Sequence, residues 1–199
     1  KSKIFNKIIV STDSKKYAKI ATKYGAHVPF LRPKNISKAT SSDYEWVKFT
    51  LDKLKKDNEI FTHFFILRPT SPLRTKNTIL RAWKKFKKFK NIDSLRAVET
   101  VKQNPGKMWK LKNKYLIPYE NYKINSQPSY NNQSKVLKKM YIQNASLEIS
   151  KVNVLKKYKT ITGRKIIPFF SQDFEGFDIN YPFDIELLKL KLKKKLRLN

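Results

Sequence analysis

Short apolar runs of strand length alternate with longer stretches of helical periodicity along most of this chain. The apolar runs predict buried strands at Lys7–Val10, Phe61–Leu67 and Ser94–Val98. The helical spacing predicts helices at Ser14–Tyr24, Tyr44–Lys56 and Thr78–Phe89. When strands and helices alternate in this way, the crossovers are right-handed and the sheet is mostly parallel. The sequence therefore predicts an α/β fold with helices layered on a mostly parallel sheet.

One long region interrupts this alternation. Residues Lys102–Lys139 are rich in Asn, Tyr, Pro and Ser and contain only short apolar runs, which predicts an arm or flap that leaves the core. Further short strands are expected at Ala26–Phe30, Met140–Ile149, Ile166–Phe170 and Gly176–Ile179, before a last helix that begins near Phe183. Because 199 residues suit one domain and no internal repeat or linker is visible, we expect residues 1–199 to form a single domain.

The net charge of +30 raises the possibility of nucleic-acid binding. Only seven of the 45 basic residues are Arg, and Asn and Ile are also abundant, which is typical of A/T-rich codon usage. The basic residues are spread along the chain, except in the tail Lys189–Arg197. At helical spacing, a core-facing stripe would comprise Ile79, Trp83, Phe86 and Phe89 and leave the neighbouring Lys in water. We expect no specific nucleic-acid site, and a basic nucleic-acid-binding module remains an alternative.

The absence of cysteine excludes disulfides and thiolate metal sites. No apolar run approaches the roughly 18 residues that a membrane span needs. The first residues, Lys1–Phe5, also lack the apolar stretch of a signal peptide. We therefore expect a protein of the cytoplasm without a membrane partner.

Three polar loops follow predicted strands, where ligands bind in open parallel sheets. They are Ser11–Asp13, Arg68–Arg74 and Gly176–Asn180. The second loop carries two Arg, whose guanidinium forks suit phosphate and carboxylate oxygens. In the third, Asp178 and Asn180 would point to the same side of an extended segment and offer oxygen ligands to Mg²⁺. Structural alternatives stay open, since Asp178 would equally suit a helix cap and Arg74 could bind backbone carbonyls.

Six short motifs, in this order, resemble the acylneuraminate cytidylyltransferase family, which includes the CMP-sialic acid synthetases. They are Ile9–Asp13, Leu31–Pro33, Leu67–Thr75, Asn104–Trp109, Tyr141–Ser146 and Phe177–Asn180. The resemblance implies a three-layer, Rossmann-like nucleotidyltransferase fold and a homodimer, with residues 102–139 as the dimerisation arm. It also implies the transfer of CMP from CTP to the anomeric hydroxyl of a nonulosonic acid, with Mg²⁺ as cofactor and pyrophosphate as second product.

The resemblance assigns roles by position. Asp178 would be the catalytic metal ligand, with Asn180 as a second ligand. Arg32 and Ser41 would lie near the nucleotide. The sugar or its carboxylate would be bound by Arg68, Lys107, Gln143 and Asn144. For Arg74, bracing of the loop is at least as good an interpretation.

The chain departs from the family pattern at three places. The opening strand and phosphate-binding loop of the family have no counterpart, so a truncated, non-catalytic remnant is a further alternative. Arg68 stands where many members have Gln, and Asn180 replaces a second Asp, which removes a negative charge from the metal site. Cytidylyltransferases for legionaminic acid, pseudaminic acid or the eight-carbon acid Kdo also remain possible, although the Pro-Thr-Ser-Pro loop resembles the Kdo enzymes less.

Overall fold

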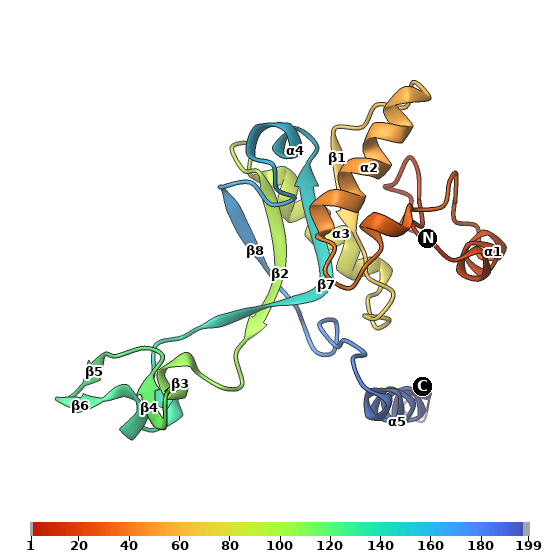
Figure 1. The fold of residues 1–199 in the computed structure, drawn as a ribbon. Coiled ribbons are helices and arrows are strands. Elements are labelled where there is room, and N and C mark those ends of the chain that lie inside the picture. Colours follow the sequence, from red (N-terminus) through yellow and green to blue (C-terminus); the bar gives the residue numbers. More distant parts are fainter. Residues whose placement is uncertain (1, 197–199) are drawn as a thin grey trace.

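The fold is built on a four-stranded sheet, which a computed structural model describes within residues 2–196 (Figure 1). Its strands lie in the order β1 (His63–Ile66), β7 (Tyr141–Lys151), β2 (Ser94–Thr100) and β8 (Ile166–Phe170). The β2 and β8 strands pair in parallel, whereas β7 is antiparallel to both β1 and β2. The strands β1, β2 and β8 therefore share one direction, as predicted for a mostly parallel sheet. The β7 strand runs in the opposite direction, because the chain leaves the sheet along β2 and comes back beside it along β7.

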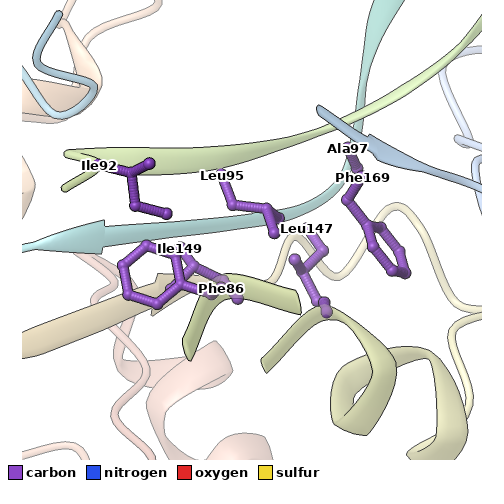
Figure 2. Packing of buried hydrophobic residues seen from close by; sticks show 8 residues of the cluster. Phe86, Ile92, Leu95, Ala97, Leu147, Ile149 and Phe169 are labelled. Atoms are coloured by element: carbon purple, nitrogen blue, oxygen red, sulfur yellow. The ribbon is translucent and has the colours of Figure 1, made fainter. Parts of the chain in front are cut away.

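Helices cover both faces of this sheet. On one face, α3 (Lys76–Lys88) packs Ala82 and Phe86 against β2 and β7 in the main hydrophobic core (Figure 2). On the other face, a second cluster joins α2 (Asp43–Lys56) and α4 (Asn153–Tyr158) to β1 through Val47, Leu155 and Ile66. These two clusters give the three-layer α/β arrangement that the sequence predicts.

The caps of the helices explain where they begin. Thr75 accepts from the backbone N–H of Thr78 at the start of α3, and Ser42 forms a capping box with Glu45 at the start of α2. The first helix, α1 (Lys15–Lys23), begins at Ser14, and the last, α5 (Pro182–Leu196), begins with a proline, which fits the first helical turn. No helix in the part of the chain that the structure describes is long and apolar enough to cross a membrane.

A large β-bulge separates the sheet from the arm. Arg96 pairs with Glu148 and Val98 pairs with Gln143, so one residue of β2 faces the four residues Asn144–Leu147 of β7. Beyond the bulge, β2 and β7 run out of the body as a ribbon (Figure 1). Two small hairpins occupy its far end, β3 (Trp109–Lys112) with β4 (Tyr115–Pro118) and β5 (Lys123–Ile124) with β6 (Gln127–Pro128). Short 3₁₀ helices flank the hairpins: η2 (Pro105–Lys107) precedes β3, and η3 (Ser129–Asn131) and η4 (Ser134–Val136) follow β6. A fourth, η1 (Lys34–Ile36), precedes α2.

Three predicted strands are wrong. Two of them, Lys7–Val10 and Ala26–Phe30, meet in a single parallel bridge between Ile9 and His27, and neither segment pairs with a strand of the main sheet. Gly176–Ile179 forms no strand either, since its backbone hydrogen bonds go to a local turn and to the loop after β1. The other predicted helices and strands form with boundaries shifted by a few residues.

The predicted aromatic stripe on α3 is right at three positions and wrong at one. Phe86 is buried, and Ile79 and Trp83 pack against the same core. Phe89 is exposed, because it is the C-cap residue and has already left the helical conformation. The basic tail Lys189–Arg197 ends outside the described residues.

Candidate active site

The loop that follows β1, Arg68–Arg74, lies at the centre of the candidate site, and we call it the hub loop. It contains Pro69 and Pro72, which cannot donate to a strand ladder, so side chains rather than pairing fix its shape. Arg74 supplies that support: its Nη1 donates to the carbonyl of Ser146 at 2.7 Å, and its Nη2 donates to the carbonyl of Arg68 at 2.8 Å. Burial lowers the pKa of the Arg74 guanidinium, although the charge of Asp178 opposes this shift. Arg74 therefore braces the loop against β7.

Arg68, at the start of this loop, binds two carboxylates. It pairs with Asp43, the first residue of α2, and its Nη2 lies 3.4 Å from Oε1 of Glu148. Trp46 also donates to Asp43, at 2.9 Å. Burial alone would raise the pKa of Asp43, but the hydrogen bonds from Arg68 and Trp46 and the nearby guanidinium charges hold it below its ordinary value. The loop is thereby tied to the N-terminus of α2.

Beneath Arg68, a second ion pair crosses the sheet. Arg96 on β2 pairs with Glu148 on β7, directly opposite in the register, and Arg96 also donates to Thr162. Desolvation lowers the pKa of Arg96 to about 10, even though the charge of Asp43 favours the cation. The sequence analysis missed Asp43, Arg96 and Glu148. For the last two there was a signal, because each charge stands among small and apolar residues of a predicted strand.

Asp178 contacts the opposite side of the same loop. Its Oδ1 accepts from the hydroxyl of Ser71 at 3.1 Å, and the N–H of Ile179 donates to the carbonyl of Thr70 at 2.8 Å. The cap of α5 is a different residue, Asp184, which accepts from the N–H groups of Asn180 and Tyr181 at 2.8 Å. The helix-cap interpretation of Asp178 is therefore wrong, and its half-buried carboxylate is oriented by the loop after β1.

The donor set fits Mg²⁺ held mainly by a substrate. Within residues 2–196 no group of three or more acidic or His side chains converges on one point. Mg²⁺ is commonly held by one or two carboxylates together with substrate phosphates and water, and Asp178 is such a carboxylate. Asn180 is exposed next to it in sequence, and its role as a second ligand stays a prediction.

Asn144 has structural partners in the bulge of β7. Its Oδ1 accepts from the N–H of Ser146 at 3.2 Å, and its Nδ2 donates to Ser171 at 3.0 Å. A Cβ added to Gly176 would lie 2.5 Å from Nδ2 of Asn144, so a glycine is required for the segment before Asp178 to pass this close. Asn144 therefore links β7 to the segment that carries Asp178. Its neighbour Gln143 is exposed.

The remaining predicted residues lie in two places. Arg32 donates from Nε to Ser37 at 2.9 Å and from its backbone N–H to Thr12 at 2.8 Å, which joins it to the loop after Ile9. Ser41 accepts from the N–H of Lys38 at 3.1 Å and lies two residues before Asp43. Lys107 is exposed in η2, which leads into β3 of the arm, away from the hub loop (Figure 1). The structure thus brings Asp178 to the loop that begins with Arg68, places Asn144 beside the segment before Asp178, and leaves Lys107 apart.

Two open hollows lie near the N-terminal part of the chain. One, of about 320 Å³, lies between α1 and residues 28–31, and the other, of about 450 Å³, lies between residues 33–36 and α2. None of the predicted site residues lines either hollow, so the candidate site rests on the hub loop and its ion pairs instead.

Comparison with known proteins assigns the family. A cytidylyltransferase family model matches residues 1–193, which is nearly the entire chain. The chain belongs to the cytidylyltransferase family. The hub loop, the bulge with Asn144 and the segment with Asp178 are therefore parts of a cytidylyltransferase domain.

Several curated relatives carry more specific names. The chain is 38% identical over 85 residues to the pseudaminic acid cytidylyltransferase of Campylobacter jejuni, an alignment that covers 43% of this chain and 37% of the relative. It is 28% identical over 201 residues to the N-acylneuraminate cytidylyltransferase of Escherichia coli, covering 98% of this chain and 44% of the relative. A flagellin modification protein B of Campylobacter coli is 28% identical over 199 residues, covering 98% of this chain and 80% of the relative.

Solved structures show the same fold at low sequence identity. A CMP:2-keto-3-deoxy-manno-octonic acid synthetase complexed with CTP has a TM-score of 0.59 at 9% identity and covers 95% of this chain and 81% of the other. A 4-diphosphocytidyl-2C-methyl-D-erythritol synthase from Anaerococcus prevotii has a TM-score of 0.58 at 10% identity, covering 96% of this chain and 84% of the other. The Rossmann-like nucleotidyltransferase fold predicted from the motifs is confirmed.

Proposed function

We propose that this cytidylyltransferase domain transfers CMP from CTP to the anomeric hydroxyl of a nonulosonic acid and releases pyrophosphate. The observation that carries this proposal is the contact of Asp178 with Ser71, in the loop that also contains Arg68 and Arg74, within a chain that matches the cytidylyltransferase family almost throughout. Relatives named for pseudaminic, N-acylneuraminic and legionaminic acids support a nonulosonic acid as the acceptor. The likeness to the octonic acid synthetase rests on 9% identity, so it supports the fold and not an eight-carbon substrate.

The mechanism is mainly one of positioning and charge neutralisation. The anomeric oxygen attacks the α-phosphorus of CTP, the bond to the β-phosphate oxygen breaks, and pyrophosphate leaves. Asp178 would hold Mg²⁺, which neutralises charge on the phosphate oxygens when bound. The brace formed by Arg74 keeps the loop, and with it Ser71 and Asp178, in one place, so no reorganisation is needed as charge develops.

The remaining assignments are part of the same proposal. Arg32 and Ser41 serve the nucleotide, Arg68, Gln143, Asn144 and Lys107 serve the sugar acid, and Asn180 assists Asp178 with Mg²⁺. Because Lys107 lies in the arm, it would meet a sugar acid only if the arm reaches a second active site, which supports a homodimer. Exposed apolar side chains along the arm support the same view: Trp109, Leu111, Tyr115, Leu116 and Ile117. A cytoplasmic location, where CTP is available, is part of the same proposal.

Nucleic-acid binding is the weaker alternative. A basic single-strand binding module stacks bases on exposed aromatic side chains between its cations. Here Phe86 is buried and Trp83 packs on the core, so the aromatic residues of α3 hold the fold together. The charge of +30 should still attract polyanions weakly at low salt.

The test is pyrophosphate release by the protein expressed from its complete coding sequence. We expect release only when CTP, Mg²⁺ and a nonulosonic acid are all present, and a strong preference over the eight-carbon acid Kdo. Equal turnover with Kdo would contradict the substrate class. Absence of turnover with every nine-carbon acid would favour the non-catalytic alternative, and submicromolar, sequence-dependent RNA or DNA binding at about 150 mM salt would favour the nucleic-acid module.

A further inference from the structure

The buried pair of Arg96 and Glu148 has no assigned part in the proposed reaction. Both side chains are almost fully enclosed, with 7% and 2% of their surface exposed. Burying two charges is costly, and a pair of apolar residues of similar volume is often as stable or more stable. Stability alone therefore gives a poor reason for this pair to lie at the centre of the sheet.

The pair is the inner half of a chain of four alternating charges. Glu148 contacts Arg96 through Oε2 and Arg68 through Oε1, at 3.4 Å in the second case. Arg68 in turn pairs with Asp43, at the first position of α2. The charges alternate from β2 to β7, to the hub loop and to α2. Glu148 therefore contacts cations on two elements, and Asp43 has a second donor in Trp46.

The choice of cation supports a geometric role. Lys is by far the commoner cation in this chain, yet both cations in the network are Arg. A guanidinium presents several N–H groups in a rigid plane, so it can bind two carboxylates at fixed angles, whereas an ammonium is a point charge on a flexible stem. Arg68 uses this property directly, since both of its terminal nitrogens donate to Asp43 and Nη2 also donates to Glu148.

We propose that the Arg96–Glu148 pair is a positioning device that fixes the guanidinium of Arg68. Arg96 holds the carboxylate of Glu148 in place inside the sheet, and Glu148 holds the buried side of Arg68. About one third of the Arg68 side chain remains exposed, which leaves a pre-oriented cation at the hub loop. The kinetic consequence rests on the proposed function: a fixed Arg68 lowers the KM for the sugar acid, whose carboxylate it would meet.

The decisive variant removes the pair without leaving a buried charge. Arg96→Met combined with Glu148→Leu replaces both residues by apolar side chains and should fold, because no unpaired charge remains. We expect the KM for the sugar acid to rise about tenfold, as for one lost charged hydrogen bond, while the KM for CTP changes little. A matched control, Lys7→Met with Glu59→Gln, removes an ion pair between the N-terminal segment and the segment before β1 and should leave both constants unchanged.

A conservative variant separates positioning from packing. Arg96→Met with Glu148→Gln keeps an amide oxygen that can still accept from Arg68 but lacks the contact with Arg96 that holds it in place, so it should recover only part of the lost affinity for the sugar acid. If the pair served only to fill the sheet, both double variants would keep the wild-type KM.

A second measurement does not depend on turnover. Only seven Arg are present, so ¹⁵N-arginine NMR can resolve their guanidinium groups. In the wild-type protein we expect restricted rotation at Arg68 and Arg96, and measurably faster rotation at Arg68 in the Arg96→Met/Glu148→Leu variant, in which Asp43 is its remaining partner. A freely rotating Arg68 in the wild type, or an unchanged Arg68 in the variant, would overturn the inference. A wild type that makes no CMP-sugar counts against the proposed function instead, and the NMR result then decides the positioning inference alone.

Discussion

The two faces of the central strands are built from opposite kinds of residue. Toward α3, β2 and β7 present apolar side chains, all completely buried: Leu95, Ala97, Leu147 and Ile149 (Figure 2). Toward α4 and the hub loop, the same two strands present polar side chains that are buried as well: Ser94, Arg96, Ser146, Glu148 and Ser150. Both faces are closed to solvent, so burial does not explain the difference.

The contrast separates stability from orientation. Apolar packing is non-directional and tolerates small shifts, and it supplies most of the favourable free energy of folding. Buried polar groups require partners at fixed distances, as in the hydrogen bond from Ser150 Oγ to the carbonyl of Ile161 at 2.6 Å. We infer that the apolar face holds the domain together while the polar face fixes the hub loop.

The largest expected effect is on the apolar face. Leu147→Ala removes a fully buried side chain from the α3 core and should lower the free energy of unfolding by about 2–5 kcal/mol. The kcat and KM of the remaining folded protein should stay near wild type. Urea denaturation and steady-state kinetics below the transition measure the two quantities. A large change in kcat with intact stability would break the division between the faces.

Asp178→Asn should lower turnover and leave stability nearly unchanged, the reverse of Leu147→Ala. We expect turnover to fall about a hundredfold, as for other single electrostatic groups at a site of developing charge. The melting temperature should change little, because the amide keeps an Oδ1 acceptor for Ser71. Asp173→Asn is the control: it removes the same charge five residues earlier, at an exposed left-handed position that Asn also tolerates. Full activity of Asp178→Asn would contradict the metal-ligand role.

Arg74→Met should lower both stability and turnover, because Arg74 connects the hub loop to β7. The loss of charged hydrogen bonds to two carbonyls should cost about 2 kcal/mol of stability and lower turnover as the loop loosens. Arg74→Lys keeps the charge but has no planar fork to reach both carbonyls, so we expect an intermediate loss. If Arg74→Lys equals wild type in chemical denaturation and in kcat, charge alone matters and the brace does not.

The smallest expected effect is on the stability of the protein at acidic pH. Burial is the largest single influence on Asp43 and would raise its pKa, but the hydrogen bonds from Arg68 and Trp46 and the charges of Arg68 and Arg96 together lower the pKa below its ordinary value of 3.8. The unfolded chain then binds this proton more readily, so the stability from Asp43 is present above pH 3.8 and is lost as the pH falls through the lower, folded value. Asp43→Asn should flatten the pH dependence of unfolding in this window. Asp93 and Glu175, whose pKa values are also lowered, would leave a residual slope. An identical slope in wild type and variant would contradict the Arg68–Asp43 pair.

The sequence predicted the layers and motifs better than the partners of single side chains. Periodicity located α2, α3 and the central strands because burial imposes it on residues close in sequence. Periodicity could not show which acidic residue caps α5, since Asp178 precedes the helix and Asp184 lies in its first turn. Only the folded chain brings Ser71 next to Asp178. The Arg96–Glu148 pair was hidden for the same reason, because 52 residues separate the two strand positions that the register places opposite one another.

The most direct test of the central claim follows the oxygen that is transferred. A nonulosonic acid equilibrated in H₂¹⁸O carries the label at its anomeric hydroxyl, and the reaction with CTP is followed by mass spectrometry and ³¹P NMR. If the anomeric oxygen attacks the α-phosphorus, the label appears in the bridging oxygen of the CMP-sugar and the pyrophosphate stays unlabelled. Unlabelled CMP-sugar, or label in the pyrophosphate, would contradict the proposed reaction.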